Sequence, residues 1–384
     1  MKLIKDVRII DYKKDTYGHV LISDGKIRKI FESLDNVELL DTEIIDGKGL
    51  CILPSFIDMH THLRDPGFVY KEDLKTGQKA ALKGGYTTLC TMANTKPVCD
   101  NEKTFKYILD KSKDLNLCDI IQISALTKGQ SGKEIVNLES LLKFTNLFSD
   151  DGHTIYDEEI MKEALKLSKR HNFKVLTHCQ PEYEIVDRDL KLLEKIGGNL
   201  HICHISLKKT IEKIKEYKDK GHKFTCEVTP HHIFKSNIDY KVNPSFRNKE
   251  DKKALIDGIK NDYIDVIATD HAPHSKEDKV KGSPGISLIE IAFSMALKVF
   301  KENNISLNKL SKLLSYNPAK ILGLKSGLIK EGYTANLVLV DLDEEYKIDT
   351  STFLSKGKNN PFNKETVNGR VKMTIKEGEI LYSH

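Results

Sequence analysis

The most constraining feature of the sequence is a short apolar run that recurs eight times between residues 51 and 321. Each run is followed by a turn, and longer segments with helical periodicity lie between the runs, as at 72–83, 101–116, 157–171, 207–220 and 286–303. Units that alternate in this way predict parallel strands joined by right-handed crossovers. The runs are CILPSFIDMHTH, YTTLCTMAN, DIIQISALT, NLFSDDG, KVLTHCQ, LHICHIS, KFTCEVTPHH and DVIATDHAPH.

Eight such units predict a closed (β/α)8 TIM-like barrel, an α/β fold of ~250 residues. The alternative is an open doubly wound sheet, but no glycine-rich phosphate loop follows any run, and polar residues cluster at the C-terminal end of nearly every run. The two flanks carry short alternating segments separated by turn residues. We therefore expect a barrel domain over 51–321 and a small composite β-sandwich domain built from 1–50 plus 322–384.

Composition excludes several classes of function. The net charge of +5 is spread over 61 basic and 56 acidic residues with no concentrated basic block, so we expect no nucleic-acid ligand. No run approaches the ~20 apolar residues that span a bilayer, and the N-terminus lacks a signal sequence, so we expect a cytoplasmic protein without a membrane partner. The seven cysteines include no CxxC pair and lie largely in apolar runs, which predicts reduced, buried thiols.

Two histidines one residue apart end the first run. Side chains at i and i+2 of a strand point to the same side, so His60 and His62 would face one space, with Arg64 next in the row. Alone, the pattern fits a metal site or two histidines at an exposed strand end. The ends of the other runs have to distinguish these interpretations.

Residues able to bind metals or transfer protons end nearly every run. A barrel brings all of these ends to one rim, where this architecture places its chemistry. Four histidines and two aspartates exceed what one tetrahedral ion needs, whereas two zinc or similar ions sharing a bridging carboxylate would use all six. Such a pair activates water, which implies hydrolysis. The residues at the run ends are His60, His62, Asn94, Asp150 or Asp151, His178, His204, His231, His232, Asp270, His271 and His274.

Other residues near these ends have less specific interpretations. Strand alternation should turn Cys179 and Cys203 to the side opposite their histidine neighbours, which predicts core positions. His231 and His232 are expected to have a loop or structural role, and His153 could approach the rim.

The motifs DMHTHLRDPG, MANTKPV, SDDG, THC, CHIS, EVTPHH and IATDHAPH, in this order, resemble the bacterial class I dihydroorotases of the amidohydrolase superfamily. The resemblance runs from about residue 45 to the C-terminus, where TFLSKGKNNPF is similar to the closing segment of that family. It implies reversible cyclisation of N-carbamoyl-L-aspartate to L-dihydroorotate in de novo pyrimidine biosynthesis. One departure is that only 25 residues separate His178 from His204, about half the interval expected in this subclass.

The resemblance also implies a role for each site residue. One or two zinc ions per subunit are expected, two being favoured, with Asp270 as both ligand and catalytic proton shuttle. Asp151 would bridge the ions, and a carboxylated Lys143 is the alternative bridge. The implied metal ligands are His60, His62, Asp151, His178, His204 and Asp270, and the implied substrate-binding residues are Arg64, Asn94, Asn243, His274 and Gly285.

The resemblance further implies a small-molecule substrate, a homodimer, and association with aspartate carbamoyltransferase as an additional assembly. The alternative function is another cyclic amidohydrolase, namely a dihydropyrimidinase, hydantoinase or allantoinase. A non-catalytic scaffold homologue is a third alternative, but here every ligand position is filled.

Overall fold

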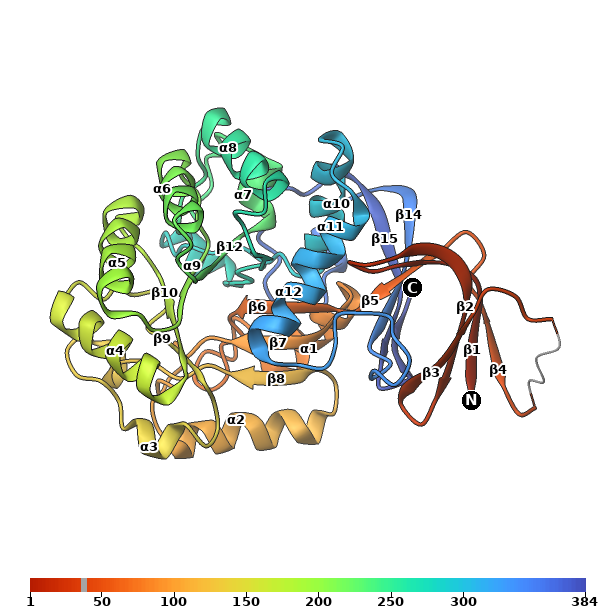
Figure 1. The fold of residues 1–384 in the computed structure, drawn as a ribbon, viewed down its shortest axis with the longest axis horizontal. Helices are drawn as coiled ribbons and strands as arrows, with labels where there is room; N and C mark the ends of the chain where they lie inside the picture. Colours follow the sequence, from red (N-terminus) through yellow and green to blue (C-terminus); the bar gives the residue numbers. More distant parts are fainter. Residues whose placement is uncertain (36–39) are drawn as a thin grey trace.

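The structure, a computed structural model, describes residues 1–35 and 40–384 and consists of a barrel beside a sheet in which both chain ends lie (Figure 1). Eight parallel strands line the barrel in chain order. They are β6 (Phe56–Thr61), β7 (Tyr86–Thr91), β8 (Asp119–Gln122), β9 (Leu147–Ser149), β10 (Lys174–Thr177), β11 (Leu200–Ile202), β12 (Thr225–Val228) and β13 (Val266–Ile267).

Two isolated bridges close the barrel. Strands β6 to β8 form one hydrogen-bonded group and β9 to β13 another. A parallel bridge from Ser124 to Phe148 joins β8 to β9, and one from Thr61 to His271 joins the ends of β6 and β13. The predicted (β/α)8 barrel is therefore confirmed.

Helices surround the barrel (Figure 1), and several begin at a side-chain cap. Asp73 and Thr76 form a capping box at α1, and Asn101 and Asp157 cap α2 and α4. The helices are α1 (Leu74–Lys83), α2 (Glu102–Leu115), α3 (Leu138–Leu141), α4 (Glu158–His171), α5 (Glu182–Ile196), α6 (Lys208–Asp219), α7 (Pro230–Phe234), α8 (Lys249–Lys260), α9 (Lys276–Val280), α10 (Ala292–Glu302), α11 (Leu307–Ser311) and α12 (Asn317–Leu322), with short η1 (Lys128–Gln130), η2 (Lys312–Tyr316) and η3 (Thr350–Thr352).

Two connections bear on the sequence predictions. Helix α5 is the one helix between β10 and β11, so the short interval between His178 and His204 still contains a complete crossover. The helix expected over 286–303 begins only at Ala292, because Ile286 is paired in a β-bridge and residues 289–291 form a turn. Ile286 bridges to His271, and the Leu288 amide donates to Nδ1 of the same histidine.

The terminal segments form one mixed sheet of eight strands in the order β16-β15-β14-β5-β1-β2-β3, with β4 paired to β1. The loop between β2 and β3 meets the C-terminal strands, because the Ala335 amide donates to Gly25 and the Gly378 amide donates to Ala335. The sheet thus folds around an apolar core of its own. Its strands are β1 (Lys2–Ile10), β2 (Asp15–Ser23), β3 (Lys26–Phe31), β4 (Glu43–Asp46), β5 (Cys51–Pro54), β14 (Leu337–Lys347), β15 (Thr366–Lys376) and β16 (Glu379–Ser383).

The first apolar run of the sequence contains two strands. Strand β5 pairs with β1 and β14 of the terminal sheet, whereas β6 begins two residues later and pairs with β7. Pro54 ends β5 and has no amide hydrogen with which to continue a ladder. Residues 51–54 therefore lie in the terminal sheet and not in the barrel.

The cysteines agree with the expectation from composition. All seven cysteines are buried free thiols. Within residues 1–35 and 40–384, every helix is too short or too polar to cross a membrane.

Phe56 packs where the barrel meets the terminal sheet. Its ring stacks on Phe293 of α10 at 4.9 Å between centroids and meets the edge of Tyr86 at 5.4 Å. We expect Phe56→Ala to lower the free energy of unfolding by about 3–5 kcal/mol, because it leaves a cavity among buried aromatic rings. Urea unfolding of the metal-free chain measures this, with Tyr17→Ala as the control, since Tyr17 is 75% exposed. Equal losses in both variants would contradict this packing.

Candidate active site

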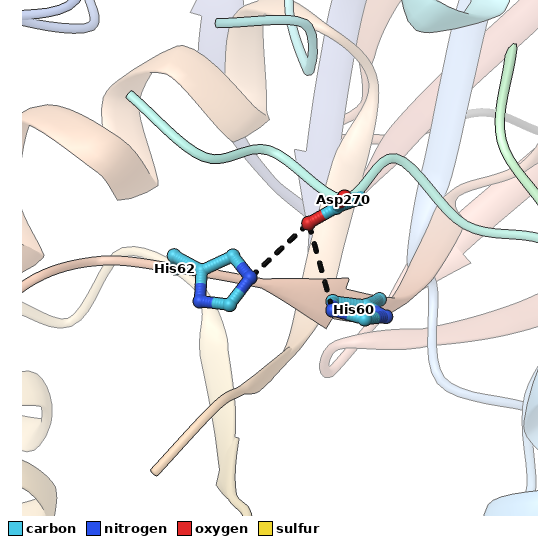
Figure 2. A group of neighbouring side chains, drawn as sticks. All are labelled: His60, His62 and Asp270. Atoms are coloured by element: carbon cyan, nitrogen blue, oxygen red, sulfur yellow. Dashed lines mark hydrogen bonds and ion pairs between the residues drawn. The ribbon is translucent and has the colours of Figure 1, made fainter. Parts of the chain in front are cut away.

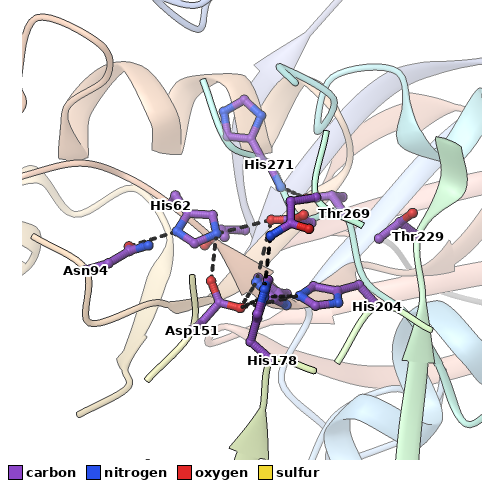
Figure 3. A network of polar contacts seen from close by, with 12 residues as sticks. His62, Asn94, Asp151, His178, His204, Thr229, Thr269 and His271 are labelled. Atoms are coloured by element: carbon purple, nitrogen blue, oxygen red, sulfur yellow. Dashed lines mark hydrogen bonds and ion pairs between the residues drawn. The ribbon is translucent and has the colours of Figure 1, made fainter. Parts of the chain in front are cut away.

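Asp151 lies at the centre of a cluster of histidines on the C-terminal rim of the barrel (Figure 3). Its Oδ1 is 3.3 Å from Nε2 of His60, 3.4 Å from Nδ1 of His178 and 3.4 Å from Nε2 of His204. Its Oδ2 is 3.3 Å from Nε2 of His62. One carboxylate thus contacts four imidazoles that come from strands far apart in the sequence.

Asp270 closes the cluster from the loop after β13 (Figure 2). Its Oδ1 is 3.1 Å from Nε2 of His62 and 3.6 Å from Nε2 of His60. The six residues predicted as metal ligands therefore converge as the sequence analysis expected.

The hydrogen bonds behind two of the histidines fix their tautomers. His62 Nδ1 donates to Oδ1 of Asn94 at 2.9 Å, and His60 Nδ1 donates to Oε1 of Glu227 at 2.6 Å. Each ring is then left with its Nε2 lone pair facing the carboxylate of Asp151. A lone pair against a carboxylate oxygen is repulsive unless a cation lies between them, so this arrangement fits a metal site.

Buried polar atoms in the cluster lead to the same conclusion. Among the residues that the structure describes, His60 Nε2 and Asp151 Oδ1 have no hydrogen-bond partner. Two sets of three residues bring their ligand atoms within 4.8 Å of one another: His60, His62 and Asp270, and His60, Asp151 and His204. Imidazole and carboxylate ligands of this kind suit zinc or a similar divalent ion.

Electrostatics keep both aspartates ionised. Burial raises the pKa of Asp151, but its contacts with the imidazoles of His60, His178 and His204 outweigh burial and hold the pKa well below its usual range. Burial likewise opposes ionisation of Asp270, yet its contacts with the imidazoles of His60 and His62 lower its pKa to about 2. Both carboxylates can therefore act as anionic ligands at neutral pH.

Three residues of the site adopt left-handed backbone conformations that are uncommon outside glycine. The φ angles are 60° at Arg64, 33° at His204 and 49° at Asp270. Such conformations cost about 1–3 kcal/mol each and gather at functional sites. Here they occur at the ends of β6, β11 and β13, where His204 and Asp270 join the cluster and Arg64 lines the cavity above it.

Cys203 is a buried core residue, as predicted, and the turn at His204 explains why both neighbours nevertheless lie near the cluster. Strict alternation would turn Cys203 away from the cluster, but the left-handed residue breaks the alternation. Cys203 lies in the apolar cluster inside the barrel, and its thiol is close to His60 and Glu227. Burial raises the pKa of this thiol, so it remains protonated. Cys179 packs in the main hydrophobic core, as predicted.

Two buried carboxylates that support the site were missed by the sequence analysis. Glu227 on β12 contacts His60 through Oε1 and His201 Nε2 through Oε2, at 3.0 Å. Asp58 on β6 accepts hydrogen bonds from the amides of His60 and Thr269, at 3.1 and 3.0 Å. The available signal was an acidic residue inside an apolar strand, since a buried charge requires a partner.

A cavity of about 250 Å³ opens above the histidine cluster. All five residues expected to bind substrate line it, as does His153. Gly285 has φ 138°, and a Cβ there would lie 2.5 Å from the carbonyl oxygen of Ala272 and 2.8 Å from Cδ2 of His274. Only glycine fits at this position. The five residues are Arg64, Asn94, Asn243, His274 and Gly285.

Other candidates lie outside the cluster. Lys143 pairs with Glu102 at 2.8 Å and its side chain is 53% exposed, so the geometry does not support it as a bridging group. Asp150 accepts from the amides of Leu126 and Thr127. His232 is buried and contacts Thr229 at 2.7 Å, in agreement with a structural role.

Comparison with known proteins places this geometry in context. A family model described as "Amidohydrolase family" matches residues 51–381. The chain is 44% identical over 398 residues to a dihydroorotase of Clostridium botulinum (strain Eklund 17B / Type B), covering 99% of both chains. It is 37% identical over 419 residues to a dihydroorotase of Aquifex aeolicus (strain VF5), again covering 99% of both.

Solved structures share the fold at lower sequence identity. An L-hydantoinase (dihydropyrimidinase) from Arthrobacter aurescens superposes with a TM-score of 0.91 at 22% identity, covering 100% of this chain and 96% of that one. A D-hydantoinase superposes with a TM-score of 0.87 at 24% identity, covering 100% and 95%. At this identity the likeness concerns the fold alone.

Glu227 offers a direct test of how the cluster is supported. We expect Glu227→Gln to keep the shape of the contact with His60 but to weaken metal binding about 10–100-fold, because the ring loses a charged partner that raises its basicity. Competition between the chain and a chelator for Zn²⁺ measures the affinity. Glu212→Gln is the matched control, since Glu212 is 62% exposed on α6. Unchanged affinity in Glu227→Gln would contradict the assigned role.

Proposed function

The chain belongs to the amidohydrolase family, and from this premise we propose that it catalyses the reversible cyclisation of N-carbamoyl-L-aspartate to L-dihydroorotate in de novo pyrimidine biosynthesis. The observation that carries the proposal is one cavity with two chemically different ends. One end holds the histidine and aspartate cluster, and the other holds Arg64 beside His274. Relatives named dihydroorotase at 44 and 37% identity over the full chain support this substrate.

We assign the cluster as the ligand set of one or two zinc ions, two being favoured. His60 and His62 would hold one ion, His178 and His204 the other, and Asp151 would bridge them, with Asp270 as a further ligand. When bound, such ions lower the pKa of a water from ~15.7 toward ~7 and polarise a carbonyl oxygen. Support comes from the lone pairs of His60 and His62 that face Asp151, and from the buried Asp151 Oδ1, which lacks a hydrogen-bond partner among residues 1–35 and 40–384.

Asp270 is assigned as the proton shuttle. Its side chain is 13% exposed and lines the cavity, whereas that of Asp151 is 4% exposed. In ring opening, Asp270 accepts the proton of the attacking water and returns it to the leaving nitrogen, as general base and then general acid. Its low pKa keeps it ready to accept that proton.

Arg64, Asn94 and His274 are assigned to the carboxylate that lies outside the ring being formed. A guanidinium grips a carboxylate bidentately, and Asn94 adds an amide donor. Asn243 has its Nδ2 3.1 Å from Nε2 of His178, so it lies between the cluster and the substrate cavity. The backbone near Gly285 forms the wall beside His274, where a substrate ring would contact it.

The alternative within the enzymes is a dihydropyrimidinase, hydantoinase or allantoinase. The substrates of these enzymes lack a ring carboxylate, so they would bring no anion to Arg64, whose Nε has no hydrogen-bond partner among the described residues. The scaffold alternative is not favoured, because all six predicted ligands converge.

The resemblance to dihydroorotases also supports proposals about assembly and location. We propose that the chain forms a homodimer in the cytoplasm and that aspartate carbamoyltransferase is an additional partner. Sedimentation of the chain alone and with that partner distinguishes these assemblies.

Replacing Asp270 tests the proton shuttle. We expect Asp270→Asn to lower kcat at least ~10²-fold, because the amide cannot accept the proton of the attacking water. Metal content should change less, since the histidines and Asp151 remain. Hydrolysis of dihydroorotate and elemental analysis of the same sample measure the two effects. Wild-type turnover with metal still bound would exclude the shuttle role.

Replacing Arg64 tests the substrate assignment. We expect Arg64→Ala to lower kcat/KM for dihydroorotate about 10²-fold, because a charge-assisted hydrogen bond is lost. For the neutral substrate dihydrouracil, kcat/KM should fall by a smaller factor than for dihydroorotate. Arg28→Ala is the control, since Arg28 is exposed on β3. If wild-type protein opens dihydrouracil and not dihydroorotate, the alternative function replaces the proposed one.

A further inference from the structure

His274 lies between two cationic side chains. Its Nε2 is 3.3 Å from Nη2 of Arg64, and its Nδ1 is 3.4 Å from Nζ of Lys71. Arginine and lysine side chains can only donate hydrogen bonds, so each of these contacts is favourable only if the facing ring nitrogen accepts.

The ring can satisfy only one of the two contacts. Burial, together with the charges of Arg64, Lys71 and Lys279, lowers the pKa of His274 to about 3, so the imidazole is neutral. A neutral imidazole has one acceptor nitrogen and one N–H. One of the two cations must therefore face an N–H.

The surroundings of Lys71 favour the contact at Nδ1. Its ammonium group lies 5.3 Å from the ring centroid of Phe68 and 3.4 Å from Oδ2 of Asp278, and its side chain is 14% exposed. Asp278 Oδ2 could accept a hydrogen bond from Nδ1 and would then favour the Nδ1–H tautomer. However, it is 4.0 Å from Nδ1, whereas Nζ of Lys71 is 3.4 Å from the same atom. Lys71 thus contacts both that carboxylate and Nδ1 of the ring, and it is the nearer of the two groups to Nδ1.

The contact at Nε2 faces the cavity instead. Arg64 and His274 both line the cavity, whereas Lys71 approaches the nitrogen on the other side of the ring. A Cβ on Gly285 would lie 3.0 Å from Nε2, so the glycine backbone confines the ring on this side. An N–H at Nε2 beside the guanidinium gives two donors on the cavity wall, with 3.3 Å between their nitrogens, close enough for one anionic oxygen to accept from both.

We propose that Lys71 is a positioning residue that fixes His274 as the Nε2–H tautomer, so that His274 and Arg64 direct two donors at the anionic group of the substrate. The identity of that group as the dihydroorotate carboxylate rests on the proposed function. An anion that accepts hydrogen bonds from both donors offsets the unfavourable contact between the Nε2–H group of His274 and the guanidinium of Arg64. Lys71 therefore makes the site selective for anionic substrates without touching them.

Nitrogen NMR of the full-length chain labelled with 15N in the histidine rings tests the tautomer at neutral pH without substrate. The signals of His274 are those absent from a His274→Gln spectrum. In the wild type we expect an acceptor shift for Nδ1 and an N–H shift for Nε2. In Lys71→Met we expect the reverse, because Nδ1 then faces Asp278 and Nε2 accepts from Arg64. Lys71→Arg keeps a cationic donor and should retain the wild-type pattern.

The matched control is Lys75→Met, since Lys75 is exposed on α1 four residues further on. Its spectrum should equal that of the wild type. A wild-type ring already in the Nδ1–H form, or an unchanged tautomer in Lys71→Met, overturns the proposal. Neither result depends on catalytic activity, so the proposal can fail while the proposed function stands, and the reverse.

Steady-state kinetics on dihydroorotate add a second readout. We expect Lys71→Met to raise KM about 10-fold or more with kcat within about threefold of wild type and unchanged zinc content, because a donor to bound substrate becomes an acceptor. Lys71→Arg should restore most of the affinity, and Lys75→Met should behave as wild type. Equal KM values in wild type and Lys71→Met would also overturn the proposal.

Discussion

The structure depends on one carboxylate buried among four imidazoles. Asp151 comes from the loop after β9, and its partners come from β6 and from the ends of β10 and β11. A buried charge without compensation is strongly unfavourable, so these segments must meet for Asp151 to be accommodated. The closed barrel provides this meeting point, because its strands all end on one rim. The cluster can therefore assemble only when the barrel closes.

The sequence predicts most of this arrangement because the signals are local. Each ligand follows an apolar run, and the parallel barrel turns that repeated position into spatial proximity. What it could not predict depends on partners distant in the chain. One apolar run divides between two sheets at Pro54, and residues 286–291 stay outside the helix because Ile286 and Leu288 contact His271. Glu227 can be recognised as a support for His60 only when β12 and β6 are seen together.

The cavity is chemically polarised, and this polarity separates the proposed substrate from its relatives. At one end of the cavity, the carboxylate and imidazole ligands favour the binding of cations. At the other end, Arg64 and the neighbouring pair of Lys71 and His274 favour the binding of an anion. These two ends match a substrate that has a carbonyl for the metal site at one end and a carboxylate for Arg64 at the other. Hydantoinases share the barrel at 22 and 24% identity, so the fold alone could not make this distinction.

The pairing of β5 with β14 has a consequence for biosynthesis. Strand β5 directly precedes β6, which carries the first two histidines, but one of its neighbours comes from residues 337–340, near the end of the chain. A ribosome must therefore make almost the whole polypeptide before the edge of β5 is covered. Until then its backbone groups remain open to other strands, so nascent chains that stall before β14 are the ones most exposed to aggregation.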